Sequence, residues 1–279
     1  MTGTGTQTDP YIPENWAEFV EAIGTENAYV SCPDNVVWDM NEIIPSGITS
    51  AIQINAAEIS GNNMTIKNLA FNCSHSFTIG KSCIITKLNF LNMYATINST
   101  SCFYTNKSGI YFRNCKFSGI ISHGSFLNGG TSYGVTFTND TGENPKGCSF
   151  NLEFYGTGQM NTASSTTYFT NCNIHIGGKN DDDFSVPVLS KCILSNCYIS
   201  GKCPSNKGLT VTCRNNVYNI EVPEGNIIFN GSDHAKTVIN DSLVDASYAN
   251  ESAINYLIKA TEEQMHDAEY LKSQGFPIA

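Results

Sequence analysis

One short motif recurs along the chain, and its spacing limits the available folds more than any other feature of the sequence. The motif is an apolar residue, a variable residue, Asn, and then a small or apolar residue. Its clear copies are centred on Asn68, Asn92, Asn114, Asn171 and Asn196, with weaker copies at Asn139 and Asn215. Successive asparagines lie between 19 and 32 residues apart, which is typical of a solenoid with loop insertions.

The residues around each asparagine predict what one coil of this solenoid contains. Apolar and polar residues alternate there, as they do in a strand with one buried face. Further strand-like runs lie at 51–54, 83–85 and 227–229, with Gly, Asn, Ser and Thr as turn residues between them. A coil of about 20 to 25 residues with two or three short strands is typical of a parallel β-solenoid. We therefore predict an all-β fold, a single-stranded right-handed parallel β-helix. Its asparagines would form an amide ladder at one bend, and the Cys, Leu or Met that follows each of them would point inward.

Both ends of the chain carry helical patterns. Trp16, Phe19, Val20 and Ile23 predict a helix over Pro13–Ile23 that caps the first coil. Near the C-terminus we expect a helix over Glu251–Ala260, followed by a second helix that starts at a capping box of Thr261 and Gln264 and runs to Gln274. The predicted divisions are an N-terminal cap segment (1–35), the parallel β-helix (36–245) and a C-terminal helical segment (246–279).

Charge and composition argue against several classes of function. The chain has 15 basic and 25 acidic side chains and a net charge of −10, with Arg113 and Arg214 as its two arginines. It therefore lacks the basic face that nucleic-acid binding requires. No run of about 20 apolar residues predicts a membrane span, and no secretion signal precedes the repeats, so we expect synthesis in a host cytoplasm. The eleven cysteines are odd in number and lack zinc-type spacing, which predicts mostly buried free thiols.

The two ends of the chain resemble a known family. The opening segments Gly3–Ile12 and Trp16–Ile23 look like the entry to pectin-lyase-like right-handed parallel β-helices. The closing segments Thr261–Met265 and Tyr270–Ile278 are similar to a tail found after such β-helices in phage and prophage structural proteins. Together with the Asn-Cys coils, the resemblance covers nearly the whole chain. It implies a β-helix protein of the bacteriophage appendage or decoration type.

Because many β-helix proteins cut polysaccharides, the sequence was searched for catalytic groups. Ser122-His123-Gly124 departs at most positions from a polygalacturonase-like motif, and neither arginine lies beside an acidic cluster as a pectate-lyase-like site requires. Asp140, Glu143 and Glu153 are the best candidates for a two-carboxylate glycosidase, but solvated turn residues explain them more simply. The five histidines lack metal-binding spacing. We therefore expect no enzymatic activity, with a tailspike polysaccharide depolymerase as the alternative.

One acidic run and two loops are candidate binding sites. Asp181 and Asp183 lie in an oxygen-rich run that could hold Ca²⁺, although a polar turn is the simpler explanation; no other cofactor is expected. Tyr133, Tyr155 and Tyr168 lie among Asn, Ser and Gly and are candidate glycan-binding residues. An aromatic face can contact a sugar ring while neighbouring amides bind its hydroxyl groups. Ordinary polar loops, with these tyrosines returning to the core, explain the pattern equally well.

Together, the residues and the resemblance predict a non-enzymatic structural protein on the surface of a bacteriophage virion, as a capsid decoration, a head fibre or a tail appendage. The expected partners are other capsid or tail proteins, further copies of the chain in a homo-oligomer such as a trimer, and a host-surface glycan, without nucleic acid or membrane. Attachment would use apolar residues near the two ends, namely Trp16, Phe19, Ile254, Leu257 and Met265, although a cap over the last coil is the simpler explanation of the C-terminal region. A bacterial surface adhesin is a second alternative, which a signal peptide or anchor in the full gene would favour.

Overall fold

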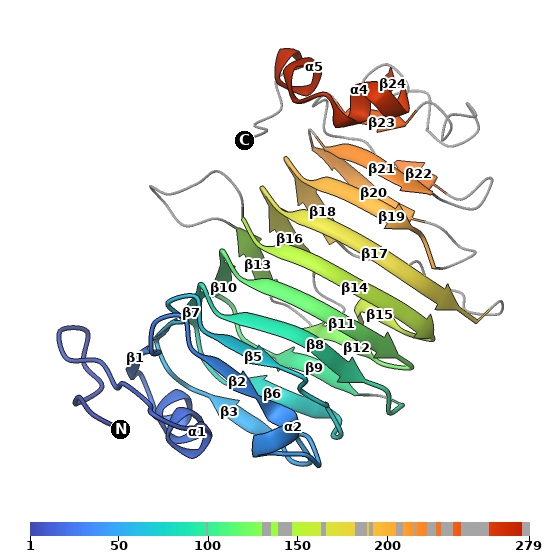
Figure 1. The fold of residues 1–279 in the computed structure, drawn as a ribbon. Helices are drawn as coiled ribbons and strands as arrows, with labels where there is room; N and C mark the ends of the chain where they lie inside the picture. Colours follow the sequence, from blue (N-terminus) through green and yellow to red (C-terminus); the bar gives the residue numbers. More distant parts are fainter. Residues whose placement is uncertain are drawn as a thin grey trace.

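The fold is built from three long sheets in which every strand pair is parallel (Figure 1). The computed structural model describes residues 1–98, 100–129, 135–138, 147–162, 166–181, 189, 192–204, 209–214, 216–221, 227–229, 237–240 and 257–274. At 209–214, 227–229, 237–240 and 257 it describes the backbone alone.

The nine-stranded sheet contains β1 (Tyr29–Ser31), β4 (Glu58–Ser60), β7 (Cys83–Thr86), β10 (Ile110–Arg113), β13 (Val135–Thr138), β16 (Thr167–Thr170), β18 (Cys192–Ser195), β20 (Leu209–Arg214) and β22 (Ile227–Phe229). The ten-stranded sheet contains β2 (Val37–Asp39), β5 (Thr65–Lys67), β8 (Asn89–Ala95), β11 (Lys116–Ser122), β14 (Ser149–Gly156), β17 (Asn173–Asn180), β19 (Tyr198–Lys202), β21 (Val217–Glu221), β23 (Thr237–Asn240) and β24 (Leu257–Ala260). The five-stranded sheet contains β3 (Ile52–Ile54), β6 (His75–Ile79), β9 (Ser101–Thr105), β12 (Ser125–Gly129) and β15 (Gln159–Asn161).

The order in which the chain visits these sheets confirms the predicted parallel β-helix. From β4 to β15 the chain passes through the nine-, ten- and five-stranded sheets in turn and then starts again, so three consecutive strands make one coil. The strand-like runs predicted at 51–54, 83–85 and 227–229 are β3, β7 and β22. The first strand of the stack, β1, lies within the segment 1–35.

The repeated asparagines occupy two different bends, which corrects the prediction of a single ladder. Asn114, Asn171 and Asn196 directly follow strands of the nine-stranded sheet, and their φ angles of 53°, 56° and 53° are left-handed. Asparagine tolerates this conformation because its short side chain can hydrogen-bond locally. Asn68 and Asn92 lie further along the coil, on the ten-stranded sheet, where Asn92 Nδ2 donates to Asn68 Oδ1 at 3.3 Å.

The position equivalent to Asn114 in the preceding coil is occupied by Lys87, with a φ of 50°. Both bends place a residue of left-handed φ near an inward apolar residue, so the same short motif appears at each. The spacing of the motif could not distinguish the two bends. Copies at either bend recur once per coil, so both sets show the same interval along the sequence.

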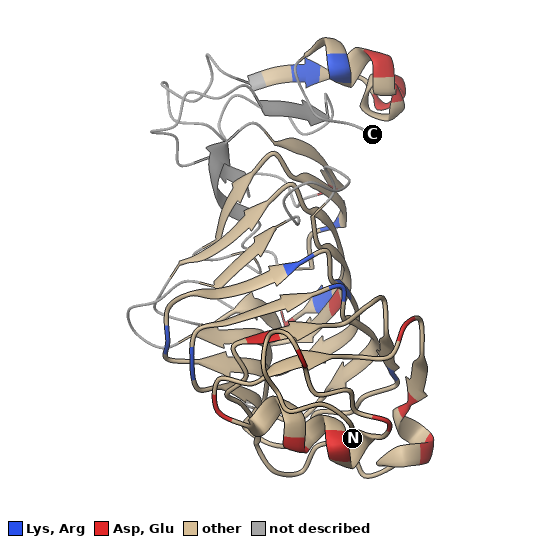
Figure 2. Ribbon diagram, turned by 90° about the vertical axis from the view of Figure 1, so that its left-hand side faces the viewer, with Lys and Arg blue, Asp and Glu red and all other residues tan. Residues whose placement is uncertain are grey.

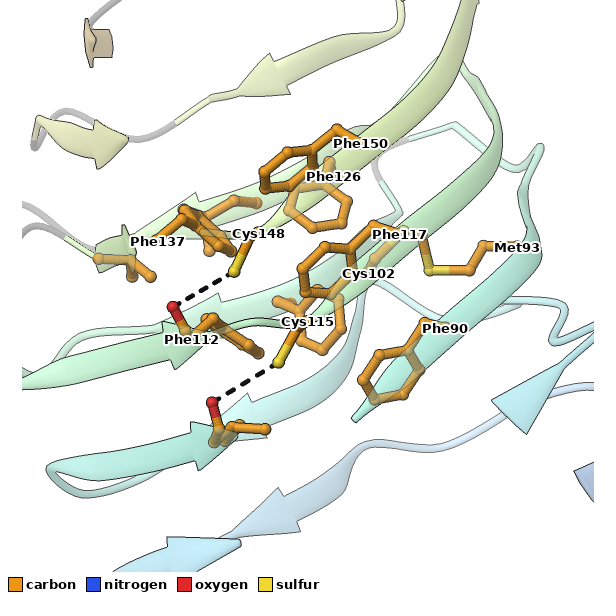
Figure 3. Packing of buried hydrophobic residues seen from close by; sticks show 14 of the residues in the cluster. Phe90, Met93, Cys102, Phe112, Cys115, Phe117, Phe126, Phe137, Cys148 and Phe150 are labelled. Carbon is orange, nitrogen blue, oxygen red and sulfur yellow. Dashed lines mark hydrogen bonds between the residues drawn. The ribbon is translucent and has the colours of Figure 1, made fainter. Parts of the chain in front are cut away.

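The core consists of phenylalanine columns, one on the inner face of each sheet. Phe90, Phe117 and Phe150 are in-register neighbours of the ten-stranded sheet, and their rings stack with centroids 5.9 and 5.1 Å apart (Figure 3). The nine-stranded sheet stacks Phe112, Phe137 and Phe169 at 5.0 Å, and the five-stranded sheet stacks Phe77 on Phe103 at 5.5 Å. Rings of different columns meet edge to face, the other favourable arrangement of aromatic pairs.

A column of buried cysteines runs beside these rings, as the repeat predicts. Cys115, Cys148, Cys172 and Cys197 each follow the bend out of the nine-stranded sheet and are at most 2% exposed. Each thiol donates to a carbonyl oxygen of the coil below; Cys148 Sγ, for example, lies 3.3 Å from Phe112 O (Figure 3). All ten cysteines whose side chains are described are free thiols, which agrees with the expectation of small buried residues.

The N-terminal helix caps the first coil, as predicted. Helix α1 (Trp16–Gly24) begins after Asn15, whose side chain accepts a hydrogen bond from the Glu18 backbone. Phe19 and Ile23 are buried, and the C-terminal carbonyls of the helix accept hydrogen bonds from the Asn55 region beside β3. A short helix α2 (Met40–Ile43) follows β2.

The C-terminal region differs from the predicted pair of helices. Of the predicted helix Glu251–Ala260, residues 257–260 form strand β24, which extends the ten-stranded sheet by pairing with β23, and the rest lies outside the described residues. The open edge of β23 supplies backbone hydrogen bonds that a short helical pattern cannot outweigh. The capping box of Thr261 and Gln264 is confirmed, but the helix divides into α4 (Glu262–His266) and α5 (Ala268–Ser273). Asp267 separates them because its carboxylate caps α5.

Candidate functional site

The outer face of the nine-stranded sheet carries a column of weakly polar and apolar side chains. Ile84, Tyr111, Thr136, Tyr168 and Ile193 are in register on successive strands. Tyr111 is 37% exposed and Tyr168 is 40% exposed, although both belong to regular strands. The two tyrosines are two strands apart, about 9.5 Å along the axis of the solenoid. This column therefore presents two aromatic rings that a single extended ligand can reach.

Tyr111 is an exposed residue that the sequence-based prediction did not include. The pattern Tyr-Phe-x-Asn-Cys begins on its strand and runs from Tyr111 to Cys115, and Tyr168 to Cys172 repeats it. The Phe of each copy points inward, so its preceding Tyr must point outward. The Arg113 guanidinium lies 5.6 Å from the centre of the Tyr111 ring, close enough for a cation–π interaction. Comparison of the two copies would have identified Tyr111 as the partner of Tyr168.

The outer face of the ten-stranded sheet holds Tyr155, which is 37% exposed. Its hydroxyl donates to Glu153 Oε2 at 2.7 Å, and this hydrogen bond raises the pKa of Tyr155 above its usual value. The two side chains lie on one face because they are two residues apart on β14. Gly177 is the in-register neighbour of Glu153 on the next strand. Because glycine has no side chain, the aliphatic part of Glu153 is left uncovered on that side.

A hollow of about 510 Å³ lies on the same sheet and extends over β11, β14 and β17. Its polar lining includes Lys116, Ser118, Asn151 and His175. The His175 Nδ1 atom is 3.1 Å from Ser200 Oγ, which orients the imidazole ring. The hollow presents amide, hydroxyl and imidazole groups and one ammonium group, a mixture suited to a polar ligand.

The three tyrosines predicted to bind glycan do not form one site. Tyr155 lies on the ten-stranded sheet and Tyr168 on the nine-stranded sheet, so they face different sides of the coil. Tyr133 lies outside the described residues. The prediction of protruding loops was wrong for Tyr155 and Tyr168, which lie on the regular strands β14 and β16. Sequence alone also could not assign these strands to their sheets.

The other predicted sites fall largely outside the described residues. Of the acids considered for glycosidase chemistry, Glu153 is exposed on β14, whereas Asp140 and Glu143 are not described. For the candidate calcium site, the Asp181 backbone donates to Gly156 O at 2.8 Å, and Asp183 is not described. Within the described part of the chain, no three His, Cys, Asp or Glu side chains gather as metal ligands.

Two of the predicted attachment residues are buried within the chain, which corrects their assignment. Phe19 packs edge to face on Trp38 at 5.7 Å, and Met265 is 1% exposed in a cluster with Val217 and Leu271. Phe19 belongs to the main core and Met265 to a separate small cluster, so neither side chain presents a free surface. Trp16 is half-buried against the same Trp38 ring. Ile254 and the side chain of Leu257 lie outside the described residues.

Among the residues that the structure describes, acidic side chains gather around the N-terminal coils and on the C-terminal helices, whereas the described strands of the central coils carry few charges (Figure 2). Within the described segments, no helix has the length and apolar character needed to cross a bilayer.

Comparisons with known proteins add no relatives: no family model, curated protein or solved structure matches the chain. The protein class that the coordinates define is therefore that of the parallel β-helix proteins, to which the pectin-lyase-like fold belongs.

Proposed function

We propose that this chain is a non-enzymatic structural protein on the surface of a bacteriophage particle, where it acts as a stiff spacer and as an adhesive surface for host glycan. The observation that carries this proposal is an in-register stack of coils whose outer strands hold exposed tyrosines and few charges. The resemblance of the two ends to phage β-helix proteins supports the location on the particle.

Stiffness follows from the direction of the interactions. Backbone hydrogen bonds between coils run along the solenoid axis, and the phenylalanine columns stack in the same direction. Bending the rod would separate rings and strands on one side of several coils at once. A rod of this kind can hold a binding face away from the particle.

Adhesion would use the outer column of the nine-stranded sheet. Tyr111 and Tyr168 offer rigid rings with few torsions to immobilise, so contact with sugar rings costs little conformational entropy. The half-buried Thr136 lies on the strand between them, so the two rings are on strands with one coil in between. An extended polysaccharide could therefore contact both rings along the axis.

Location is tested by quantitative mass spectrometry of phage particles purified from the bacterial host that carries the gene. Copies in the hundreds per particle would support a capsid decoration, and a few copies in multiples of three or six would support an appendage. Absence from the particles would refute the proposal and favour the adhesin. Light scattering on the purified chain measures whether it forms the predicted trimer.

Adhesion is tested with the double variant Tyr111→Ala and Tyr168→Ala, using the fraction of labelled protein that sediments with host cells. We expect a several-fold decrease. Tyr94→Ala is the matched control, because Tyr94 is 39% exposed on the ten-stranded sheet. An equal decrease in the control would refute a role for the column. Release of reducing ends from host polysaccharide by the wild-type protein would instead support the depolymerase.

A further inference from the structure

A second hollow lies at the turns that lead from the ten-stranded to the five-stranded sheet, away from the tyrosine column. It has a volume of about 340 Å³ and spans the turns before β9, β12 and β15. Thr100, His123, Ser125, Asn128 and Gln159 are among its lining residues. We call it the corner groove. None of its described lining residues is Asp, Glu, Lys or Arg.

A row of hydroxyl groups follows the axis of the solenoid along this groove. Ser101 and Ser125 are in-register neighbours on β9 and β12, and Thr162 follows β15 on the next coil. The Thr162 hydroxyl donates to Ser125 Oγ at 3.1 Å, and the Ser125 hydroxyl donates to Ser101 Oγ at 3.3 Å. Each hydroxyl can donate once and accept twice, so these two bonds use part of the capacity of the row. The remainder can serve a ligand that also donates and accepts.

Thr100 supplies the observation that points to a ligand. It is 1% exposed and lines the corner groove, yet its Oγ1 atom has no hydrogen-bond partner among the described residues. A buried hydroxyl is ordinarily paired, because burying it without a partner removes its bonds to water. Because the Oγ1 atom is itself buried, a polar ligand in the groove would provide the missing partner after a small displacement of the turn before β9.

His123 forms a wall of the groove through an unusual backbone conformation. Its φ of 55° turns the chain sharply between β11 and β12. The imidazole ring then lies against Gly156, where a Cβ atom would be 2.1 Å from His123 Cε1. Glycine at this position therefore leaves room for the ring. The ring, the amide of Gln159 and the hydroxyl row surround the groove with hydrogen-bonding groups.

We propose that the corner groove binds one unit of an uncharged, hydroxyl-rich ligand, namely a neutral saccharide residue. Hydroxyl and amide groups complement sugar hydroxyls because both sides donate and accept hydrogen bonds. An anionic sugar would find no lysine or arginine among the described lining residues to balance its charge. The biological use of this site rests on the proposed glycan-binding role, but the binding itself does not depend on the chain being part of a phage particle.

The test is isothermal titration of the full chain with maltohexaose, cellohexaose and the fully N-acetylated chitohexaose, with tetragalacturonate as the charged comparison. The key variant is Thr100→Val, which replaces the unpaired hydroxyl by a methyl group of similar size. We expect it to weaken binding of the neutral oligosaccharide about fivefold, the effect of losing one neutral hydrogen bond. Its melting temperature should be unchanged or higher, because a buried unpaired hydroxyl is removed. Ser125→Ala should also weaken binding, through the centre of the hydroxyl row.

Thr65→Val makes the same chemical change on β5 of the ten-stranded sheet, outside both the corner groove and the tyrosine column, and should leave binding unchanged. The proposal is overturned if none of the three neutral oligosaccharides binds, if tetragalacturonate binds more tightly than all of them, or if Thr65→Val weakens binding as much as Thr100→Val. Particle mass spectrometry tests only whether the chain is part of a phage particle, and the titration tests only whether the groove binds a saccharide. Each proposal can therefore fail without the other.

Discussion

Replacing Phe117 by Ala tests whether the phenylalanine columns hold the solenoid together. The Phe117 ring is 1% exposed and lies at the centre of the described core. Six other phenylalanine rings surround it, with centroid distances from 5.1 to 6.0 Å. Two of these, Phe90 and Phe150, stack on its faces from the coils on either side. Truncation therefore opens a cavity that interrupts the column along its axis.

The expected loss follows from the size of that cavity. Buried Phe→Ala substitutions cost about 3 to 5 kcal/mol of unfolding free energy, and the in-register strands on both sides restrict collapse of the site. We expect about 4 kcal/mol. Tyr168→Ala, which removes a ring that is 40% exposed, should cost less than about 1 kcal/mol.

Urea unfolding measures both variants. With a slope near the upper end for small proteins, about 3 kcal/mol/M, the Phe117→Ala midpoint should fall by about 1.3 M. Both tryptophans, Trp16 and Trp38, lie in the N-terminal coils, so their fluorescence reports that end while circular dichroism reports all strands. The two transitions should separate in the variant, because coils couple only to their neighbours. A midpoint shift no larger than that of Tyr168→Ala would refute the structural role of the column.

Two further predictions concern the bend and the buried thiols. Asn171→Ala should lower the unfolding free energy by about 1 to 2 kcal/mol, because the φ of 56° at this position is left-handed. Asn171→Gly should cost much less, because glycine adopts this φ without strain. Thermal melting compares the two variants, and equal losses of stability would contradict the explanation. Burial raises the pKa of Cys32 and Cys83 from 9.0 to about 12. Above about pH 9 the unfolded chain then binds fewer protons than the native chain, so stability should be complete below that pH and fall as the pH rises towards 12. Urea unfolding at about pH 8 and about pH 10.5 measures this fall, and Cys32→Ala should reduce it; an unchanged pH dependence in that variant would contradict the assignment.

Much of the architecture was predictable from local patterns. Alternation identified strands such as Phe169-Thr170 leading to Asn171, and the capping box at Thr261 marked a helix start that the structure confirms. These features depend on residues close together in the chain, whose conformational preferences are visible in the sequence.

Other features depended on contacts between distant residues. The helical pattern before Ala260 became strand β24 where it meets β23, because an open sheet edge offers partners that the local sequence does not reveal. Phe19 and Met265 look like attachment residues in sequence, but Phe19 packs into the chain's own core and Met265 into a small cluster with Val217 and Leu271. The apolar character of a side chain predicts that it is buried. It does not show whether the chain's own core or a partner protein covers it.

The candidate sites show the same division. The sequence by itself determined that the chain is a repeating parallel β-helix and that small residues follow the asparagine bends. Only the tertiary structure decided that Tyr155 and Tyr168 face outward from different sheets, that Tyr111 and Tyr168 lie two strands apart in register, and that Thr100, whose hydroxyl is unpaired, lines a groove. The physical reason is that strand alternation is local, whereas the neighbours of a side chain in a solenoid come from the coils above and below, about 20 to 30 residues away, in a register that backbone pairing sets.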